Sequence, residues 1–124
     1  MQYTILIYES KGDMEKRKNP AEAAAYRAGW TAYTKTLTDA GVKVGGAGLE
    51  PPDLATTVRL RNGERLVQDG PYADTKEQLG GYYNIEVPDL DTALKYAAMC
   101  PAAPNGVIEV RPHLQMPASA TSNA

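Results

Sequence analysis

The chain has 124 residues, a formal net charge of −2, 43% hydrophobic and 23% charged residues, which is the composition of one ordinary globular domain. The lack of a basic excess argues against direct nucleic-acid contact. No apolar run is long enough for a membrane span or a signal peptide, so we expect a cytoplasmic protein. One cysteine and one histidine argue against both a disulfide framework and a zinc site.

The first predicted element is a strand over residues 3–8. Both of its faces are largely apolar, which is typical of a strand in the middle of a sheet that is covered on each side. The charged residues 11–18 are expected to form a loop. Asn19, Pro20 and Glu22 then have the pattern of a helix start. One apolar stripe follows along the helix, ending at Gly41: Ala23, Tyr26, Trp30, Tyr33, Leu37 and Ala40.

A weaker strand over residues 42–49 ends before Pro51. Its glycines do not have the spacing of a dinucleotide-binding loop, so no organic cofactor is expected. Residues 56–69 are predicted to form a hairpin around Asn62-Gly63, with Thr56 facing Asp69. Alternation places Asp69 on the same face as the hairpin's valines. The hairpin therefore predicts a carboxylate that points toward the apolar side of the sheet.

The next strand spans residues 80–87, with Tyr83 on one face and Tyr82 on the other. Asp89 is predicted to cap a second helix, which Pro101 ends. The inner stripe of that helix is expected to be Leu90, Ala93, Leu94 and Ala97. The last strand spans residues 107–111. Residues 1–114 then form the domain, and residues 115–124 are expected to be a flexible tail.

These elements predict an α+β fold in two layers, an antiparallel sheet with two helices on one face. The other face of the sheet carries Leu6 and Tyr8. Apolar surface of this kind is usually covered, and a twofold homodimer is the commonest cover.

Four runs of sequence resemble the DGPF branch of the YCII-related family: DGPY at 69–72, TKEQLGGYY at 75–83, IEVPDLD at 85–91 and EVRP at 109–112. Tyr72 replaces the usual Phe, and the resemblance extends over about residues 1–112. It implies a ferredoxin-like sandwich that dimerises, sheet against sheet, as a dimeric α+β barrel.

The resemblance implies less about activity, because most members of this branch have no assigned reaction. Members are often encoded beside extracytoplasmic-function sigma factors or fused to them. In the wider family a His and Asp pair has been proposed as catalytic, and one relative is a dehydrochlorinase of a ring compound. The Asp of that pair corresponds to Asp69, whereas its His has no counterpart on the first helix, which offers Tyr26, Trp30 and Tyr33.

Asp69 is the candidate catalytic residue. A carboxylate on an apolar face is desolvated, which favours its protonated form and suits general acid/base chemistry. The alternative is structural, since Asp-Gly-Pro is strong turn chemistry. His113, the only histidine, either replaces the missing helix histidine or is exposed near the terminus.

The candidate substrate-binding residues are Tyr8, Tyr72, Tyr82 and Arg111. Tyr8 and Tyr82, together with Tyr83, would line a cleft between two sheets or fill the dimer core. Tyr72 would line a pocket or pack in the core. Arg111 would bind an anionic group or pair with Glu86 or Glu109.

Three hypotheses follow. The first is a small-molecule enzyme of the lyase or isomerase type in which Asp69 moves a proton, with no metal and no cofactor. The second is a non-catalytic dimeric module that binds a ligand or a partner in sigma-factor regulation. The third is a structural dimer without a ligand. Sequence alone leaves open whether the protein is an enzyme.

Overall fold

The computed structural model of the chain describes residues 1–116. It has a four-stranded antiparallel sheet in the order β2-β5-β1-β6 and a separate two-stranded hairpin, β3-β4. The elements are β1 (Gln2–Glu9), α1 (Lys11–Glu15), α2 (Ala23–Asp39), β2 (Lys43–Gly48), the 3₁₀ turn η1 (Pro52–Leu54), β3 (Thr56–Arg61), β4 (Glu64–Asp69), β5 (Gln78–Glu86), α3 (Leu90–Ala98) and β6 (Val107–Pro112).

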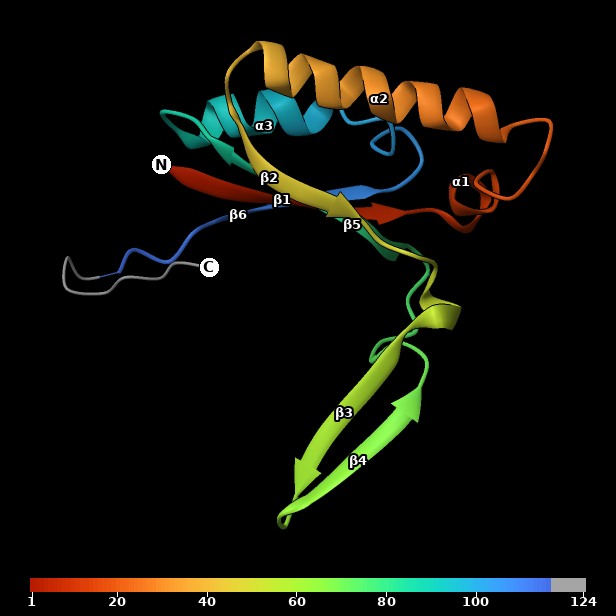
Figure 1. The fold of residues 1–124 in the computed structure, drawn as a ribbon. Helices are drawn as coiled ribbons and strands as arrows, with labels where there is room; N and C mark the ends of the chain where they lie inside the picture. The colour runs from red at the N-terminus through yellow and green to blue at the C-terminus, as the bar shows by residue number, and fades with distance from the viewer. Residues whose placement is uncertain (117–124) are drawn as a thin grey trace.

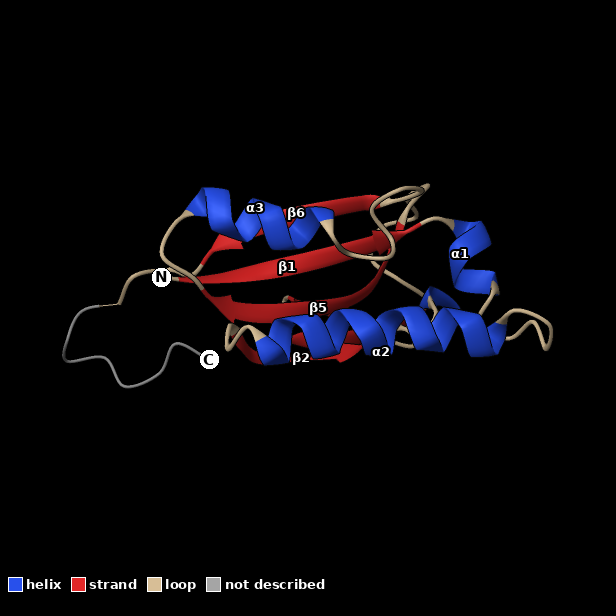
Figure 2. Cartoon of the chain, turned by 90° about the horizontal axis from the view of Figure 1, so that it is seen from above, coloured by secondary structure: helices blue, strands red, loops and turns tan. Residues whose placement is uncertain are grey.

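Helices α2 and α3 lie side by side on one face of the sheet (Figures 1 and 2). The strand order and the antiparallel pairing are those of the ferredoxin-like fold, with the hairpin inserted between β2 and β5. The expected α+β class is therefore confirmed. Most of the tail expected at residues 115–124 lies outside the described residues.

Strand β1 is an internal strand, as its two apolar faces predicted. Tyr3, Ile5 and Ile7 point toward the helices and are buried. They pack with Leu37 of α2 and Ile85 of β5, neither of which has any exposed surface. This alternation fixes the register of the whole sheet, because a slip by one residue would turn the core side chains outward.

The expectation of a loop at residues 11–18 is wrong. Residues Lys11–Glu15 form helix α1, and the Ser10 hydroxyl caps it by accepting a hydrogen bond from the Asp13 amide at 3.1 Å. Met14 is buried and attaches the short helix to the body. The sequence did not predict this helix because one buried methionine among five residues makes no apolar stripe with helical periodicity.

Helix α2 begins at Ala23, and the residues predicted to start it form the preceding turn. There the Asn19 carbonyl accepts hydrogen bonds from the amides of Glu22 and Ala23, at 3.0 and 2.9 Å. The predicted stripe faces the sheet from Ala23 to Leu37, with Tyr33 and Leu37 buried, whereas its last member, Ala40, is exposed at the C-cap.

In helix α3 the predicted Asp89 cap is confirmed by a hydrogen bond from the Thr92 amide at 2.9 Å. The predicted inner stripe is wrong in part, because Leu90 and Leu94 are 47% and 46% exposed. Ala93 and Ala97 form the buried face instead.

The hairpin has the predicted register, with Thr56 opposite Asp69 and Arg61 opposite Glu64. Asn62 and Gly63 both have positive φ, 52° and 79°, as its two-residue turn requires. The hairpin does not join the main sheet, however, and it projects from the side opposite the helices (Figure 1). The predicted position of Asp69 against the apolar side of a sheet is therefore wrong for the single chain, where Asp69 is exposed.

The segment before β5 has no helical turn, so the loop of residues 71–77 leads directly into the strand.

None of the helices within residues 1–116 has both the length and the apolar composition needed to cross a membrane.

Candidate functional site

The sheet face opposite the helices, which we call the open face, carries three of the predicted binding residues. Tyr82 of β5 lies opposite Leu6 of β1, and Arg111 of β6 lies opposite Thr4. Tyr8 and Tyr82 are half-buried in the single chain. The structure therefore brings Tyr8, Tyr82 and Arg111 to one face.

Within the described residues, two ion pairs lie on the open face, one long and one short. The Arg111 side chain is 70% exposed, and its Nε lies 3.9 Å from Glu109 Oε2. Glu86 accepts a hydrogen bond from the N-terminal amine, which lowers the pKa of this carboxyl. Of the two predicted partners, Glu86 and Glu109, Arg111 pairs with Glu109. This pair is weak enough for Arg111 to accept an anionic ligand.

Tyr83 is not part of this face. Its ring packs edge-on against Tyr33 of α2, with centroids 5.4 Å apart, and its hydroxyl lies 2.5 Å from the Thr34 hydroxyl. The expectation that it lines a cleft with Tyr8 and Tyr82 is wrong, because neighbouring residues of a strand point to opposite faces.

A chain of hydrogen bonds crosses the open face from β5 to the end of β6. The Thr4 hydroxyl donates to Asn84 Oδ1 at 2.7 Å and lies 2.7 Å from His113 Nε2. The His113 amide also bonds the Gln2 carbonyl at 2.9 Å, which extends the pairing with β1 beyond β6. The only histidine of the chain is therefore held on the same face as Arg111.

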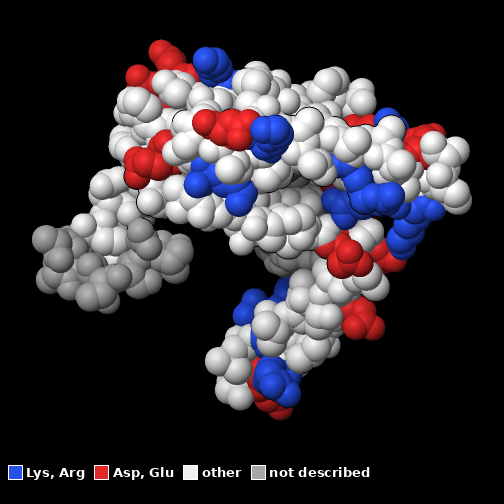
Figure 3. All heavy atoms as spheres, turned by 45° about the horizontal axis from the view of Figure 1, so that its top comes forward, with Lys and Arg blue, Asp and Glu red and all other residues white. Residues whose placement is uncertain are grey.

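Asp69 and Tyr72 lie on or beside the hairpin, away from this face. Tyr72 is 82% exposed, and the Arg59 guanidinium lies 5.6 Å from the centre of its ring. Charged side chains of both signs gather on the projecting hairpin, which stands apart from the body (Figure 3). In one chain the structure does not bring these two residues together with Tyr8, Tyr82 and Arg111.

A second polar cluster lies on the helix side of the sheet, where Glu9 ends β1. Its side chain is 1% exposed. One carboxylate oxygen accepts a hydrogen bond from Arg17 Nη2 at 2.6 Å, and the other accepts one from the Tyr26 hydroxyl. Arg17 Nε in turn donates to the Tyr26 oxygen at 3.0 Å. Burial, reinforced by the bond to Glu9, raises the pKa of Tyr26 to about 12.

Arg17 also donates to the carbonyls of Leu49 and Gly80, the latter at 3.1 Å. It thereby joins the α1–α2 connection to the ends of β2 and β5. A Cβ at Gly80 would lie 3.0 Å from Arg17 Nη2 and closer still to the Glu9 carboxylate. The first glycine of the LGG run is thus required by this buried pair.

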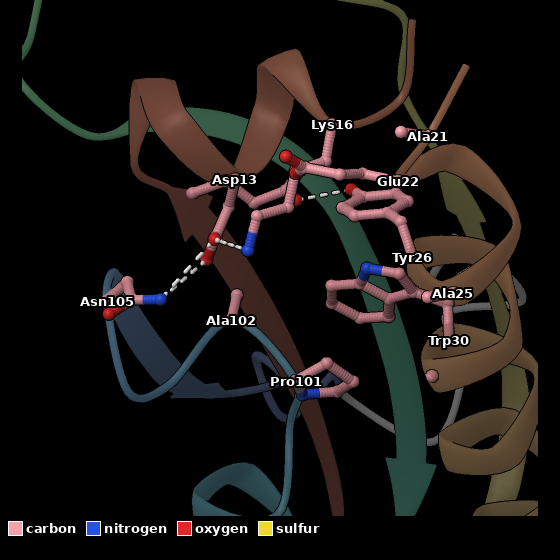
Figure 4. Close-up of a pocket in the computed structure, with 12 residues that line it drawn as sticks. Asp13, Lys16, Ala21, Glu22, Ala25, Tyr26, Trp30, Pro101, Ala102 and Asn105 are labelled. Atoms are coloured by element: carbon pink, nitrogen blue, oxygen red, sulfur yellow. Dashed lines mark hydrogen bonds and ion pairs between the residues drawn. The ribbon is translucent and has the colours of Figure 1, made fainter. Parts of the chain in front are cut away.

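Two cavities flank Glu9, Tyr26 and Trp30. The larger, about 550 Å³, extends toward Asp13 and Asn105 (Figure 4). Asn105 Nδ2 lies 3.3 and 3.4 Å from the two carboxylate oxygens of Asp13. The smaller, about 330 Å³, lies between α2 and strands β2 and β5. Both cavities are large enough for a small ligand, although every polar atom of the Glu9 carboxylate already has a partner within the protein.

The sequence contains one signal for this cluster. Glu9 continues the alternation of Tyr3, Ile5 and Ile7, and a carboxylate that continues a buried series needs a buried partner. Within residues 1–116 no three His, Cys, Asp or Glu side chains are arranged to hold a metal ion.

Comparisons with known proteins agree with this architecture. The model of the YCII-related domain matches residues 1–117. An uncharacterized protein of Rhizobium meliloti (strain 1021) is 36% identical over 114 residues, which cover 90% of this chain and 91% of that protein. Among solved structures, 5-chloro-2-hydroxyhydroquinone dehydrochlorinase from Burkholderia phenoliruptrix AC1100, in complex with 2,5-dihydroxybenzoquinone, has a TM-score of 0.51 at 16% identity. The likeness covers 90% of this chain and 92% of that one, and at this identity it shows the fold. The chain belongs to the YCII-related domain family.

Proposed function

We propose that the chain is a cytoplasmic small-molecule enzyme of the lyase or isomerase type, from the DGPF branch of its family, and that it works as a homodimer. The observation that carries the proposal is the unsupported hairpin. Val58, Leu60 and Val67 are 64%, 68% and 58% exposed, and the hairpin pairs only with itself. A two-stranded hairpin of this kind is marginally stable in water by itself, so it needs a surface to cover.

A second copy of the chain offers that surface. The open face has half-buried Leu6, Tyr8 and Tyr82, and the hairpin projects from the same side of the sheet (Figure 1). In a twofold dimer each hairpin would cross the open face of the partner. Asp69 and Tyr72 of one copy would then join Tyr8, Tyr82 and Arg111 of the other.

The chemistry of these residues favours proton transfer on an acidic or ring-shaped substrate. Covered by a partner, the Asp69 carboxylate would lose water and become a general acid or base. Arg111 would hold an anionic oxygen, and the tyrosine hydroxyls would orient a polar ring. The similar solved structure is a dehydrochlorinase with a dihydroxyquinone bound, which supports a ring compound as the substrate class. None of these roles calls for a metal or an organic cofactor.

The test combines oligomeric state and turnover. Light scattering should give twice the mass of the chain. A screen of chlorinated and enolisable hydroxyquinols should find a substrate whose turnover falls about 100-fold or more in Asp69→Asn, the usual range for a general acid/base. Asp74→Asn is the matched control, because Asp74 is also exposed in the loop before β5. A monomer, or equal turnover in both variants, would refute the proposal.

The alternative is a non-catalytic dimeric module that binds a ligand or a protein partner, with sigma-factor regulation as the context. The observation that favours it is the aromatic stripe of α2, where the tilted rings of Tyr26 and Trp30 have their centroids 6.3 Å apart and no histidine is present. Capture of a sigma factor by the dimer, without turnover in the same screen, would decide for this alternative.

A further inference from the structure

We propose that His113 is the proton acceptor of the open-face site, and that Thr4 and Asn84 are positioning residues that fix its tautomer. This inference rests on the proposed function, because it names the group that would act with Asp69. His113 would supply the histidine that α2 lacks, although His113 lies on the opposite face of the sheet from α2.

The tautomer follows from counting protons along the chain of hydrogen bonds. Asn84 Oδ1 can only accept, so the single proton of the Thr4 hydroxyl is used in the 2.7 Å bond to it. The Thr4 oxygen must then accept from His113 Nε2, 2.7 Å away. Nε2 therefore carries a proton, and in the neutral ring Nδ1 carries none.

Nδ1 is accessible as well as unprotonated. No hydrogen bond to it is formed by residues 1–116, and that part of the chain holds no buried polar side-chain atom without a partner. Among these residues, Nδ1 of the half-buried His113 is therefore neither hydrogen-bonded nor fully buried. A side chain whose one nitrogen is fixed by the protein and whose other is free is suited to accept a proton from a ligand.

The neighbouring charges define the ligand class. Arg111 precedes His113 by two residues in an extended segment, so the two side chains leave the same side of the strand about 7 Å apart. Glu86, the nearby carboxylate, pairs with the N-terminal amine. A phenol or enol fits this arrangement. Its O–H bond breaks, the proton goes to Nδ1, and the electron pair stays on an oxyanion that Arg111 stabilises.

The single histidine makes the tautomer directly measurable. In protein with ¹⁵N-labelled histidine, the neutral ring should carry its proton on Nε2. Thr4→Ser should keep this state, whereas Thr4→Val should give a mixture of tautomers. Thr57→Val, on the hairpin strand β3, is the matched control and should change nothing. A wild-type ring protonated on Nδ1 would overturn the inference.

A second measurement tests proton transfer with 4-nitrophenol, a phenol whose phenolate is yellow. At about pH 7 the protein should increase the yellow fraction while the ¹⁵N signals show protonation of Nδ1, and His113→Gln should remove both effects. Absence of binding, or bound phenol that stays protonated, would overturn the role of His113. The proposed function fails separately, by a monomeric state or by active Asp69→Asn, neither of which alters the tautomer.

Discussion

Removal of the Glu9 carboxylate tests whether the buried cluster holds the helix layer on the sheet. In Glu9→Ala, Arg17 keeps its bonds to the Leu49 and Gly80 carbonyls but loses the opposite charge 2.6 Å away. Removing one partner of a buried ion pair costs about 3–5 kcal/mol. Because the Arg17 side chain is 20% exposed, water compensates part of the loss, and we expect about 3 kcal/mol.

This loss would be a large fraction of the stability of a domain, which is typically about 5–15 kcal/mol. It corresponds to a melting temperature lower by about 10 °C for a chain of this size. Urea unfolding followed by circular dichroism measures it directly. Glu15→Ala is the control, because Glu15 is exposed on α1, and its effect should stay within about 0.5 kcal/mol.

A methyl group added at Gly80 would contact the same cluster, which allows a second experiment. Gly80→Ala places a methyl group against the Glu9 carboxylate and Arg17, and we expect it to cost about 2 kcal/mol or more. In the Glu9→Ala background the carboxylate is gone, so the same methyl group should cost much less. A coupling of about 1–2 kcal/mol between the two sites would confirm the contact. Additive effects, or a loss below about 1 kcal/mol in Glu9→Ala, would refute this account of the cluster.

Three further predictions concern the same body of the protein. Burial raises the pKa of Tyr26 to about 12 from its unfolded value of about 10. The protonated form of Tyr26 therefore contributes its full stabilisation below pH 10, and this stabilisation is lost as the pH rises toward 12. The free energy of unfolding of Tyr26→Phe, measured over the same pH range, should not show this loss. Burial raises the pKa of the Cys100 thiol to about 11, so a thiol reagent at pH 8 should react slowly with native protein and rapidly in urea. Gly106→Ala should destabilise by about 2 kcal/mol or more in thermal unfolding, because its Cβ would lie against the backbone carbonyls of Tyr8 and Ala102.

Local rules were sufficient for much of the fold. The alternation of residues 3–8 predicted an internal strand, Asn62-Gly63 predicted the register of the hairpin to the residue, and Asp89 predicted the start of α3. Each of these depends on neighbours in sequence. The attachment of the hairpin does not, because a two-residue turn specifies how β3 meets β4 and nothing about which surface the pair covers.

The sequence predicts which face of the sheet the candidate residues occupy, but not which residues from distant elements meet. Strand alternation was enough to place Tyr8, Tyr82 and Arg111 on one side of the sheet, as the observed pairing shows. The cluster of Glu9, Arg17 and Tyr26 was missed because its members come from a strand, a connection and a helix, 17 residues apart at most, with no periodic pattern to join them. Contacts of that kind are set by tertiary packing, which single-sequence patterns do not report.

The two faces of the sheet differ in how completely their polar side chains are paired. We therefore expect substitutions on the two faces to have different effects. On the helix side every buried polar side-chain atom within the described chain has a partner, so substitutions there act first on stability. On the open side, residues 1–116 leave half-buried tyrosines, a weakly paired arginine and a histidine whose ring is bonded through Nε2 and not through Nδ1. These groups are poised to meet a ligand or a second copy. A variant of Glu9 that loses activity would therefore lose it through unfolding, whereas a variant of His113 should lose it in a protein that melts as the wild type does.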